Sequence, residues 1–517
     1  MRRRSDGPFS ARSFLVLLCA SVPSFMINLD ANIVAVSLPA IVRSMHADFA
    51  AIEWVVSTYT LTFGCLVLPA GAVADRYGRK RVLLLGVGIF VIASLICGTA
   101  SSLAVLNSAR TLQGVGAALQ LSASLAILSH EFTGANRGRA FAFWGTMVGV
   151  AIAAGPIAGG IVTQTFGWEW AFRINPAIGA AVILLTFYTV PESADPGADR
   201  VDVLGVVLFT SGVFALTLGL ISGNARGWSS PTIALAFGCA VVLLAGFLVA
   251  EALQRRPMVD LRLFERLTFL GANIAALAFA ATLLTTLTYL PIYFQGALDC
   301  NPLQAGLLML PLGVPLFVVP RFVAIHLAHR LSGRALLTIG LTLLTTGLFA
   351  LAVAVPLFNY RTLIPGLLAA GIGAGMLNSE VVRVGMTVIP LDRAGMASGV
   401  SGTVRFTGIV IGFAALGAVL AARTTTVLRS GIDGLGPPLV GVDYVALVRS
   451  VIAGDLSGAV SSAPEAVREP LHTIVRISFG DGFQAILLAA AAFAALSALV
   501  TWALVRHQDT SPVERKR

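Results

Sequence analysis

The sequence predicts an all-α integral membrane protein with about fourteen transmembrane helices, and two observations lead to this fold class. Only 12% of the 517 residues are charged and 57% are hydrophobic, whereas a soluble domain carries about 25% charged residues. Apolar runs of about 20 residues, the length that crosses a bilayer as a helix, recur along the whole chain. We expect helices near residues 14–38, 52–72, 82–100, 103–128, 139–163, 170–190, 203–222, 231–253, 267–295, 303–325, 335–355, 362–388, 397–422 and 482–505.

The basic residues predict the orientation of these helices. Most of the 35 lysines and arginines fall in loops on one side of the predicted bundle, for example Arg76–Arg81 and Arg515–Arg517. Cytoplasmic loops are enriched in these residues, so we expect a multi-pass protein of the inner (cytoplasmic) membrane with both termini cytoplasmic. The net charge of +10 is therefore a membrane signal, and we expect no nucleic-acid partner.

Two linkers predict the domain organisation. The acidic segment Glu192–Asp202 follows the sixth helix, and the basic segment Gln254–Arg266 follows the eighth. We expect a six-helix bundle in residues 1–190, linkers with an inserted helix pair in residues 191–266, and a second six-helix bundle in residues 267–517. The hydrophilic segment 423–481 is expected to be a long, partly ordered outer loop.

The loop between the second and third helices carries the first family motif. Gly71–Arg81 reads GAVADRYGRKR, and a degraded copy, Ile325–Arg334, occupies the matching place in the second bundle. The spacing resembles the cytoplasmic loop motif of the major facilitator superfamily, whose halves are parallel repeats. The resemblance implies the major facilitator fold, with a conformational switch that includes Gly71, Asp75, Arg76, Gly78 and Arg79.

Further segments resemble the fourteen-helix drug:proton antiporters of the EmrB/QacA type. They are Leu29–Pro39, Arg110–Gly116, Gly149–Gly160, Trp168–Gly179 and Gly395–Gly412. The third of these is similar to the fifth-helix motif of antiporters, which implies an antiporter helix built on Gly149, Gly155, Pro156, Gly159 and Gly160.

Five charged residues fall inside the predicted spans, where charges are costly and mark transport pathways or pairs. By helix rise, Asp30 and Arg110 both lie about 10–12 Å below the outer boundary, so they can pair. Glu380 and Arg405 are both about 12 Å deep from the inner side, so we also expect them to pair near the cytoplasmic side, where Arg405 would belong to the conformational switch. Arg383, one turn from Glu380, is the competing partner.

Polar residues extend this predicted path. Arg110, Gln113, Gln120 and Ser124 share one face of the fourth helix, and the resemblance places the first, fourth, ninth and twelfth helices along a central cavity. We therefore expect Arg110, Gln113, Gln120, Arg383 and Tyr289 to line the substrate path. Purely structural roles remain open: each ion pair would then only join helices, and Tyr289 would lie in the membrane interface.

The leading functional hypothesis is a proton-coupled multidrug efflux antiporter that exports small amphipathic or cationic compounds. Burial disfavours the charged form of a carboxylate, which lets Asp30 and Glu380 exchange protons as the coupling groups. The chain has no G-x-x-x-x-G-K-[ST] motif and no Cys/His cluster or catalytic triad. We therefore expect no ATP drive, no cofactor, no metal site and no enzyme activity. The partners would be a small-molecule substrate, protons and the lipid bilayer.

Three alternatives stay open. The same fold would serve a specific metabolite or organic-anion transporter, because Arg110, Arg383 and Arg405 suit an anion. A non-transporting membrane sensor or scaffold would instead use segment 423–481 to bind a partner. An accessory periplasmic or outer-membrane partner of an exporter also stays open.

Overall fold

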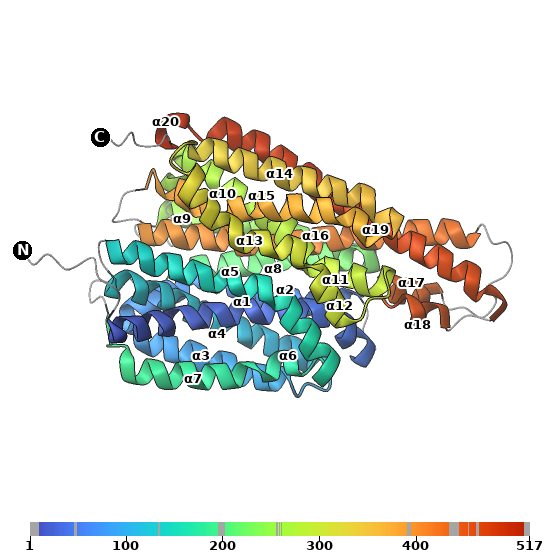
Figure 1. Ribbon diagram of the computed structural model, residues 1–517, viewed down its shortest axis with the longest axis horizontal. Helices are drawn as coiled ribbons and strands as arrows, with labels where there is room; N and C mark the ends of the chain where they lie inside the picture. Colours follow the sequence, from blue (N-terminus) through green and yellow to red (C-terminus); the bar gives the residue numbers. More distant parts are fainter. Residues whose placement is uncertain are drawn as a thin grey trace, which may run out of the picture.

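The computed structural model describes residues 10–45, 49–132, 135–194, 202–254, 257, 259, 261–389, 394–433, 444–452, 454–461 and 465–510. Within these residues the chain forms helices and no strand. The helices run roughly along the long axis of the molecule, and the two chain ends lie at the same end of it (Figure 1). We call this the terminal end and the opposite one the far end.

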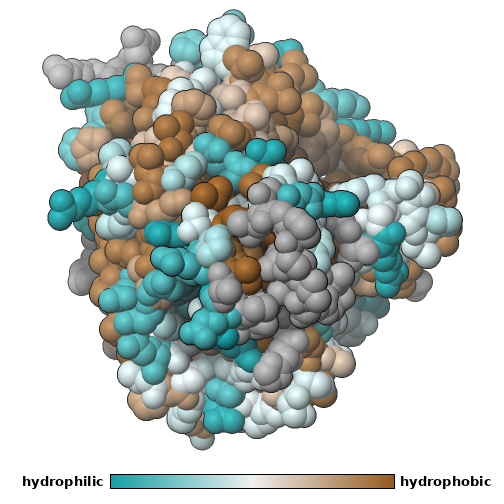
Figure 2. All heavy atoms as spheres, turned by 90° about the vertical axis from the view of Figure 1, so that its right-hand side faces the viewer, coloured by the Kyte–Doolittle hydropathy of each residue, from teal (hydrophilic) through white to brown (hydrophobic). Residues whose placement is uncertain are grey.

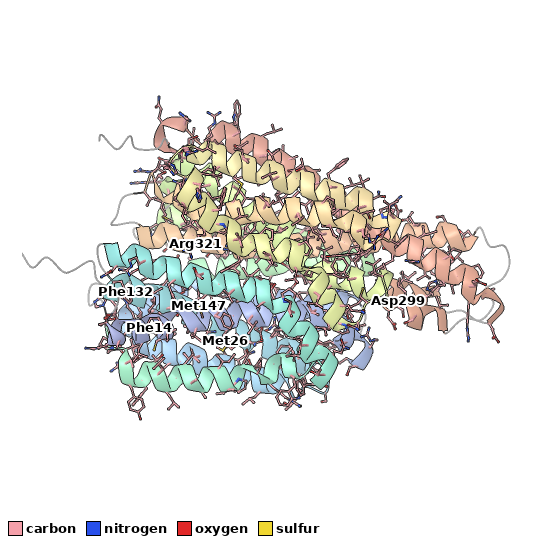
Figure 3. The ribbon with its side chains drawn as sticks, viewed as in Figure 1. Phe14, Met26, Phe132, Met147, Asp299 and Arg321 are labelled. Carbon is pink, nitrogen blue, oxygen red and sulfur yellow. The ribbon has the colours of Figure 1, made fainter. Side chains whose placement is uncertain are left out.

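The first half of the chain forms six spans. They are α1 (Ala11–Met45), α2 (Phe49–Tyr77), α3 (Arg79–Cys97), α4 (Leu103–Glu131), α5 (Ala135–Phe166) and the pair α6 (Trp170–Arg173) and α7 (Asn175–Thr189). The pairs α1–α5, α2–α4 and α3–α4 pack closely. Phe14 and Phe132 lie toward the terminal end and Asp299 lies at the far end (Figure 3).

Two further helices, α8 (Val203–Arg226) and α9 (Pro231–Leu253), pack against each other, and α8 also contacts α2 and α16. The side chain of Asp202 accepts a hydrogen bond from the N–H of Gly205 and so caps the first turn of α8. Most of α9 is exposed and apolar, as suits a helix that faces lipid.

The second half again forms six spans, two of them interrupted by π-helical turns. They are α10 (Leu267–Phe279) with η2 (Ala280–Leu284) and α11 (Thr285–Ala297); α12 (Pro302–Leu308) with α13 (Leu310–Phe322) and η3 (Val323–Leu327); α14 (Gly333–Ala354) with η4 (Val355–Leu357); α15 (Tyr360–Met386); α16 (Ala394–Asp433); and α19 (Arg468–Leu504). The short elements are η1 (Leu261–Glu265), α17 (Tyr444–Ile452), α18 (Leu456–Ser461), η6 (Glu465–Val467) and α20 (His507–Thr510).

In the described residues, 13 helices are long and apolar enough to cross a membrane, and α2 adds a fourteenth. That helix is bent by 53° between Val67 and Pro69, because proline cannot continue the helical hydrogen bonds. Large apolar side chains such as Leu85, Leu235 and Phe349 are exposed on the outside of the bundle, where a bilayer would cover them. The predicted fourteen spans are therefore present.

The segment 423–481 differs from the loop that we expected. Its two ends continue α16 and α19, and α17 and α18 lie between them (Figure 1). At 1.5 Å per residue, the 40 residues of α16 extend about 60 Å, twice the thickness of the hydrocarbon core. Beyond the apolar span, Arg423 of α16 pairs with Asp481 of α19 at 2.8 Å. This ion pair joins the two helical extensions in water. Hydrophilic side chains are spread over this far end (Figure 2).

Candidate functional site

The central feature of the first half is a buried ion pair between α1 and α4. Arg110 Nη1 lies 2.7 Å from Asp30 Oδ2, and the two side chains are 1% and 0% exposed. The pairing agrees with the depths expected from the sequence. Because each charge is removed from water, each depends on the other for its stability.

Two amides complete the binding of the Asp30 carboxylate. Gln113 Nε2 donates to Asp30 Oδ1 at 3.0 Å, and Asn175 Nδ2 donates to the same oxygen at 2.7 Å. Both amides also contact Ser94 Oγ, at 2.9 Å and 3.3 Å. The Asp30 carboxylate of α1 therefore accepts three charge-assisted hydrogen bonds from α4 and α7, and Ser94 of α3 holds the two amides in place.

The guanidinium of Arg110 is held on its other sides as well. It donates from Nε to the carbonyl oxygen of Val55 at 3.1 Å and from Nη1 to Gln113 Oε1 at 2.7 Å. The ring of Tyr59 lies 4.1 Å from the guanidinium carbon, a cation–π contact. The Tyr59 hydroxyl is buried and has no hydrogen-bond partner among the described residues.

Sequence reasoning did not single out Asn175, Ser94 or Tyr59. Asn175 lies inside the Trp168–Gly179 segment, and that segment was the one available signal for it. The other two are isolated polar residues in apolar helices, and only the packing of α2 and α3 on α4 brings them to the ion pair.

Two other residues predicted for the substrate path are fully buried in this conformation. Both amide atoms of Gln120 lack a hydrogen-bond partner among the described residues. Tyr289 donates from its hydroxyl to the carbonyl oxygen of Phe413 at 2.8 Å and stacks on that ring. Tyr289 thus joins α11 to α16, and its side chain is not on the outer surface of the bundle. Its predicted place on a substrate path stays a prediction.

The expected pair between Glu380 and Arg405 is wrong. Glu380, 2% exposed, binds Arg383 on the same helix: Arg383 Nε donates to Glu380 Oε2 at 2.7 Å, and Nη2 contacts the same oxygen. Arg405 instead lies over the ring of Phe279, 5.4 Å from its centroid. Similar depth on neighbouring helices was not sufficient, because the rotation of α16 about its axis turns Arg405 toward α10.

A double-mutant cycle distinguishes these two arrangements. We expect Glu380→Gln and Arg383→Gln each to lower the thermal stability of the purified protein, and the double variant to lose less than the sum. The coupling energy should be about 0.5 kcal/mol or more, as for residues in direct contact. The same cycle for Glu380 and Arg405 serves as the control and should give coupling near zero. A larger coupling for the control pair would contradict the arrangement described here.

The loop between α2 and α3 forms a compact turn. Arg79 donates from Nε and Nη2 to Asp75 Oδ1, at 2.9 Å and 2.7 Å. Gly78 has a φ angle of +111°, a backbone conformation that residues with a side chain rarely adopt. Arg76 is exposed and lies over the ring of Tyr77, and Gly71 has open space beside it.

Glu192, in the linker after α7, holds this turn from outside. Its carboxylate accepts hydrogen bonds from the N–H groups of Lys80 and Arg81, at 3.1 Å and 3.2 Å. A side-chain carbon at Gly78 would lie 2.7 Å from Glu192 Oε1. The acidic linker that we expected only to separate two blocks thus caps the start of α3.

We expect Asp75→Ala to lower transport of every substrate by a similar factor, because the turn joins α2 to α3 and contains none of the residues around the buried ion pair. Glu192→Gln should act in the same direction and more weakly, since it keeps one acceptor oxygen. The measurement is the initial rate of efflux for several chemically different compounds. Selective loss of one compound would show that the turn contributes to substrate choice.

The helix α5 lies at the contact between the two halves, and this contact loosens toward the terminal end. A side-chain carbon added at Gly160, near the far end, would lie 2.5 Å from the carbonyl oxygen of Pro302. One added at Gly149 would lie 3.4 Å from Phe317, and one added at Gly145 would have no neighbour within 4 Å. Gly155 and Gly159 pack on Asn32 and Ile33 of α1, and the carbonyl of Pro156 packs on Gly306. The halves are therefore closed at the far end and diverge toward the terminal end.

A second set of contacts closes the far end. Gln295 Nε2 of α11 donates to the carbonyl oxygen of Val36 at 2.9 Å, and the N–H of Leu303 donates to Gln164 Oε1 at 3.3 Å. At the other side of the interface, Gly402 of α16 faces Val67 of α2. Both hydrogen bonds must break before the far end can open.

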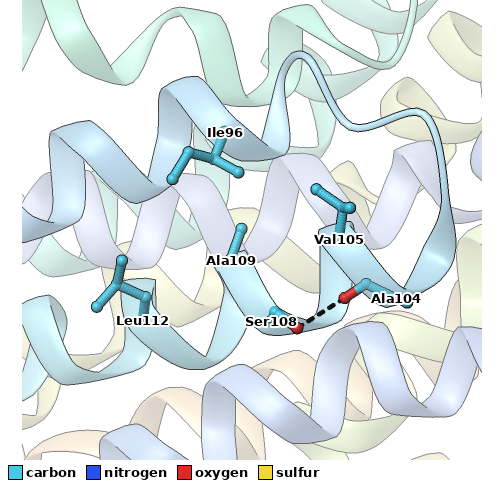
Figure 4. Close-up of a pocket in the computed structure, with 6 residues that line it drawn as sticks. All are labelled: Ile96, Ala104, Val105, Ser108, Ala109 and Leu112. Atoms are coloured by element: carbon cyan, nitrogen blue, oxygen red, sulfur yellow. Dashed lines mark hydrogen bonds between the residues drawn. The ribbon is translucent and has the colours of Figure 1, made fainter.

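A surface groove between α3 and α4 is unsuited to substrate. It is lined by Ile96, Ala104, Val105, Ser108, Ala109 and Leu112 (Figure 4). Its one polar side chain, Ser108, donates to the carbonyl oxygen of Ala104 at 2.8 Å. Most of the lining is exposed and apolar, so this groove faces lipid in a bilayer.

Comparison with known proteins identifies the family. A model of the Major Facilitator Superfamily matches residues 21–413. The chain belongs to this superfamily. Multidrug resistance protein Stp of Mycobacterium tuberculosis (strain CDC 1551 / Oshkosh) is 34% identical over 494 residues, which cover 94% of this chain and 91% of that protein. Methylenomycin A resistance protein of Streptomyces coelicolor (strain ATCC BAA-471 / A3(2) / M145) is 32% identical over 401 residues, 76% of this chain and 83% of that protein.

The fold of the superfamily is also evident in solved structures. A bacterial homologue of the human lysosomal transporter Spinster has a TM-score of 0.63 at 14% identity, over 98% of this chain and 99% of that one. The predicted major facilitator fold is therefore confirmed. The buried Asp30 pair lies in the first of the superfamily's two halves and the Glu380 pair in the second.

Proposed function

We propose that this superfamily member is a proton-coupled drug efflux transporter of the cytoplasmic membrane, with both termini cytoplasmic. The observation that carries the proposal is the Asp30 carboxylate, buried in a span and held by Arg110, Gln113 and Asn175. The names of the relatives, a multidrug resistance protein and an antibiotic resistance protein, support a drug as the substrate.

The ion pair supplies the coupling in this proposal. When Asp30 accepts a proton, its charge is lost and Arg110 no longer has its counter-ion. That change alters the interaction energy between α1 and α4. It thereby shifts the equilibrium between the conformation that is open at the terminal end and the one that is open at the far end. When the proton leaves on the other side, the pair forms again. A ligand drives such a cycle only through different affinities for the two states.

The direction of the cycle follows from the proposed orientation. With the termini in the cytoplasm, the divergence of the halves at the terminal end makes this an inward-facing conformation, which would load its cargo from the cytoplasm. Opening of the far end would then release the cargo and expose Asp30 to protons from outside. When the protein returns to the inward-facing conformation, Asp30 would release its proton into the cytoplasm. No step requires ATP.

The proposal is tested with everted membrane vesicles that contain the protein and a pH-sensitive dye. We expect a subset of a drug panel to cause proton efflux from acidified vesicles, and a protonophore to abolish accumulation of those drugs. Accumulation that needs ATP and survives the protonophore would refute proton coupling. Vesicles that move protons with none of the drugs would refute drug efflux.

A further inference from the structure

Of the three arginines that the sequence placed deep in the spans, Arg110, Arg383 and Arg405, the last has no acidic partner in the described part of the chain. Arg110 is neutralised by Asp30 and Arg383 by Glu380, whereas the Arg405 guanidinium lies over the ring of Phe279. An aromatic ring attracts a cation but does not neutralise it. The positive charge of Arg405 is therefore not neutralised by a carboxylate of the described residues.

The position of Arg405 on α16 places this charge between the two halves. Gly402, about one turn before Arg405, and Phe406, the next residue after it, face α2 at Val67 and Gly64. Gly408 and Gly412 face Leu277 and Ala281 of the second half. At about 100° per residue, Arg405 lies between these two faces of the helix, in the angle between α2 and α10.

This angle opens toward the terminal end. A carbon added at Gly64 would lie 2.6 Å from Phe406, one added at Gly402 would lie 3.8 Å from Val67, and one added at Gly71, beyond the bend in α2, would have nothing within 4 Å. Arg405 is partly exposed there. A compound that entered between α2 and α10 from the terminal end would meet the guanidinium without having to displace a protein carboxylate.

An unpaired cation inside a membrane is costly, and an anion that binds it removes that cost. The guanidinium can donate two parallel hydrogen bonds to a carboxylate while its face stays on an aromatic ring. A cationic compound would be repelled by the same charge. We infer that Arg405 is the binding site for the acidic group of an amphipathic anion, a carboxylate or a similarly acidic oxygen. This inference rests on the proposed drug efflux and specifies its substrate class as anionic, in contrast to the cationic compounds suggested by the sequence.

The test uses binding, which does not depend on proton coupling. A panel of amphipathic aromatic carboxylic acids, each with its methyl ester, is titrated against the purified full-length protein in detergent, and the shift in melting temperature is recorded. The variants are Arg405→Gln, Arg405→Lys and the control Arg423→Gln. Arg423 lies on the same helix beyond the membrane and pairs with Asp481.

We expect acids to bind the wild-type protein more tightly than their esters. In Arg405→Gln, the affinity for acids should fall about 10- to 100-fold, as for loss of a charge-assisted hydrogen bond, and that for the esters by less than about 3-fold. Arg405→Lys should keep part of the preference for acids, and Arg423→Gln should keep all of it.

Three results would overturn the inference. They are esters that bind as tightly as acids, an acid preference that survives Arg405→Gln, and a panel in which no acid stabilises the protein. Efflux in the vesicle assay would still stand in each case, so failure of this site is distinguishable from failure of drug export. An unfolded Arg405→Gln protein would be recognised by its melting curve, and Arg405→Lys would then carry the comparison.

Discussion

Replacement of Asp30 by asparagine is expected to abolish proton-driven drug accumulation, with at least a hundredfold loss of initial rate. Asparagine has nearly the shape of aspartate but cannot exchange a proton, so the cycle loses its coupling step. Arg110 would keep the carbonyl oxygen of Val55, the Gln113 side chain and the ring of Tyr59 as partners. The variant should therefore insert in the membrane, although loss of one partner of a buried pair costs about 3–5 kcal/mol of stability.

The measurement separates coupling from folding. Drug-for-drug exchange without a proton gradient should persist in Asp30→Asn, whereas uphill accumulation should vanish. Asp30→Glu keeps a titratable group and should recover part of the accumulation. Asp481→Asn, the same change at a partly exposed pair near the far end, should leave both activities unchanged. Normal accumulation in Asp30→Asn would remove this residue from the mechanism.

Gly160→Val is expected to stop transport by preventing closure of the far end. A side-chain carbon there would lie 2.5 Å from the carbonyl oxygen of Pro302 and 2.7 Å from Leu303 Cα. These are backbone atoms, so the neighbouring helix cannot yield by changing a rotamer and must move away as a whole. The halves would stay apart at this end, and we expect efflux to fall at least tenfold. Gly145→Val, on the same helix with nothing within 4 Å, should transport normally.

Cys300, in the turn between α11 and α12, reports on this closure. It is a free, half-buried cysteine, and burial, with a contribution from Asp299, raises the pKa of its thiol. The reactive thiolate is therefore scarce in the closed form. Opening the far end should expose the thiol, lower its pKa and speed its labelling by a membrane-impermeant maleimide. Unchanged labelling in Gly160→Val would mean that this contact does not control the opening.

Several features followed from the sequence because their causes are local. Each span is recognised by its own length and polarity, since the bilayer imposes the same requirement on every crossing helix. The equal depth of Asp30 and Arg110, which allows their contact, also followed, because the depth of a residue depends only on its distance from the helix end. The motif Gly71–Arg81 was expected in the loop between the second and third helices, and the structure adds the ion pair between Asp75 and Arg79 there.

Other features depended on how helices rotate and pack, which no single segment encodes. Asn175 and Ser94 reach Asp30 only because α3, α4 and α7 converge on α1. The hydrophilic composition of segment 423–481 indicated a loop, but the helices α16 and α19 support each other beyond the membrane and stay helical there.

The partner of Glu380 shows the same distinction most clearly. Depth allowed both Arg383 and Arg405, and only the angle of α16 about its own axis excluded Arg405. That angle is set by contacts with α2 and α10, which lie more than a hundred residues away in the chain. The sequence by itself thus determined that the protein spans a membrane and carries charges at defined depths. Tertiary packing decided which of those charges are neutralised, because a side chain's direction is set by all the helices around it.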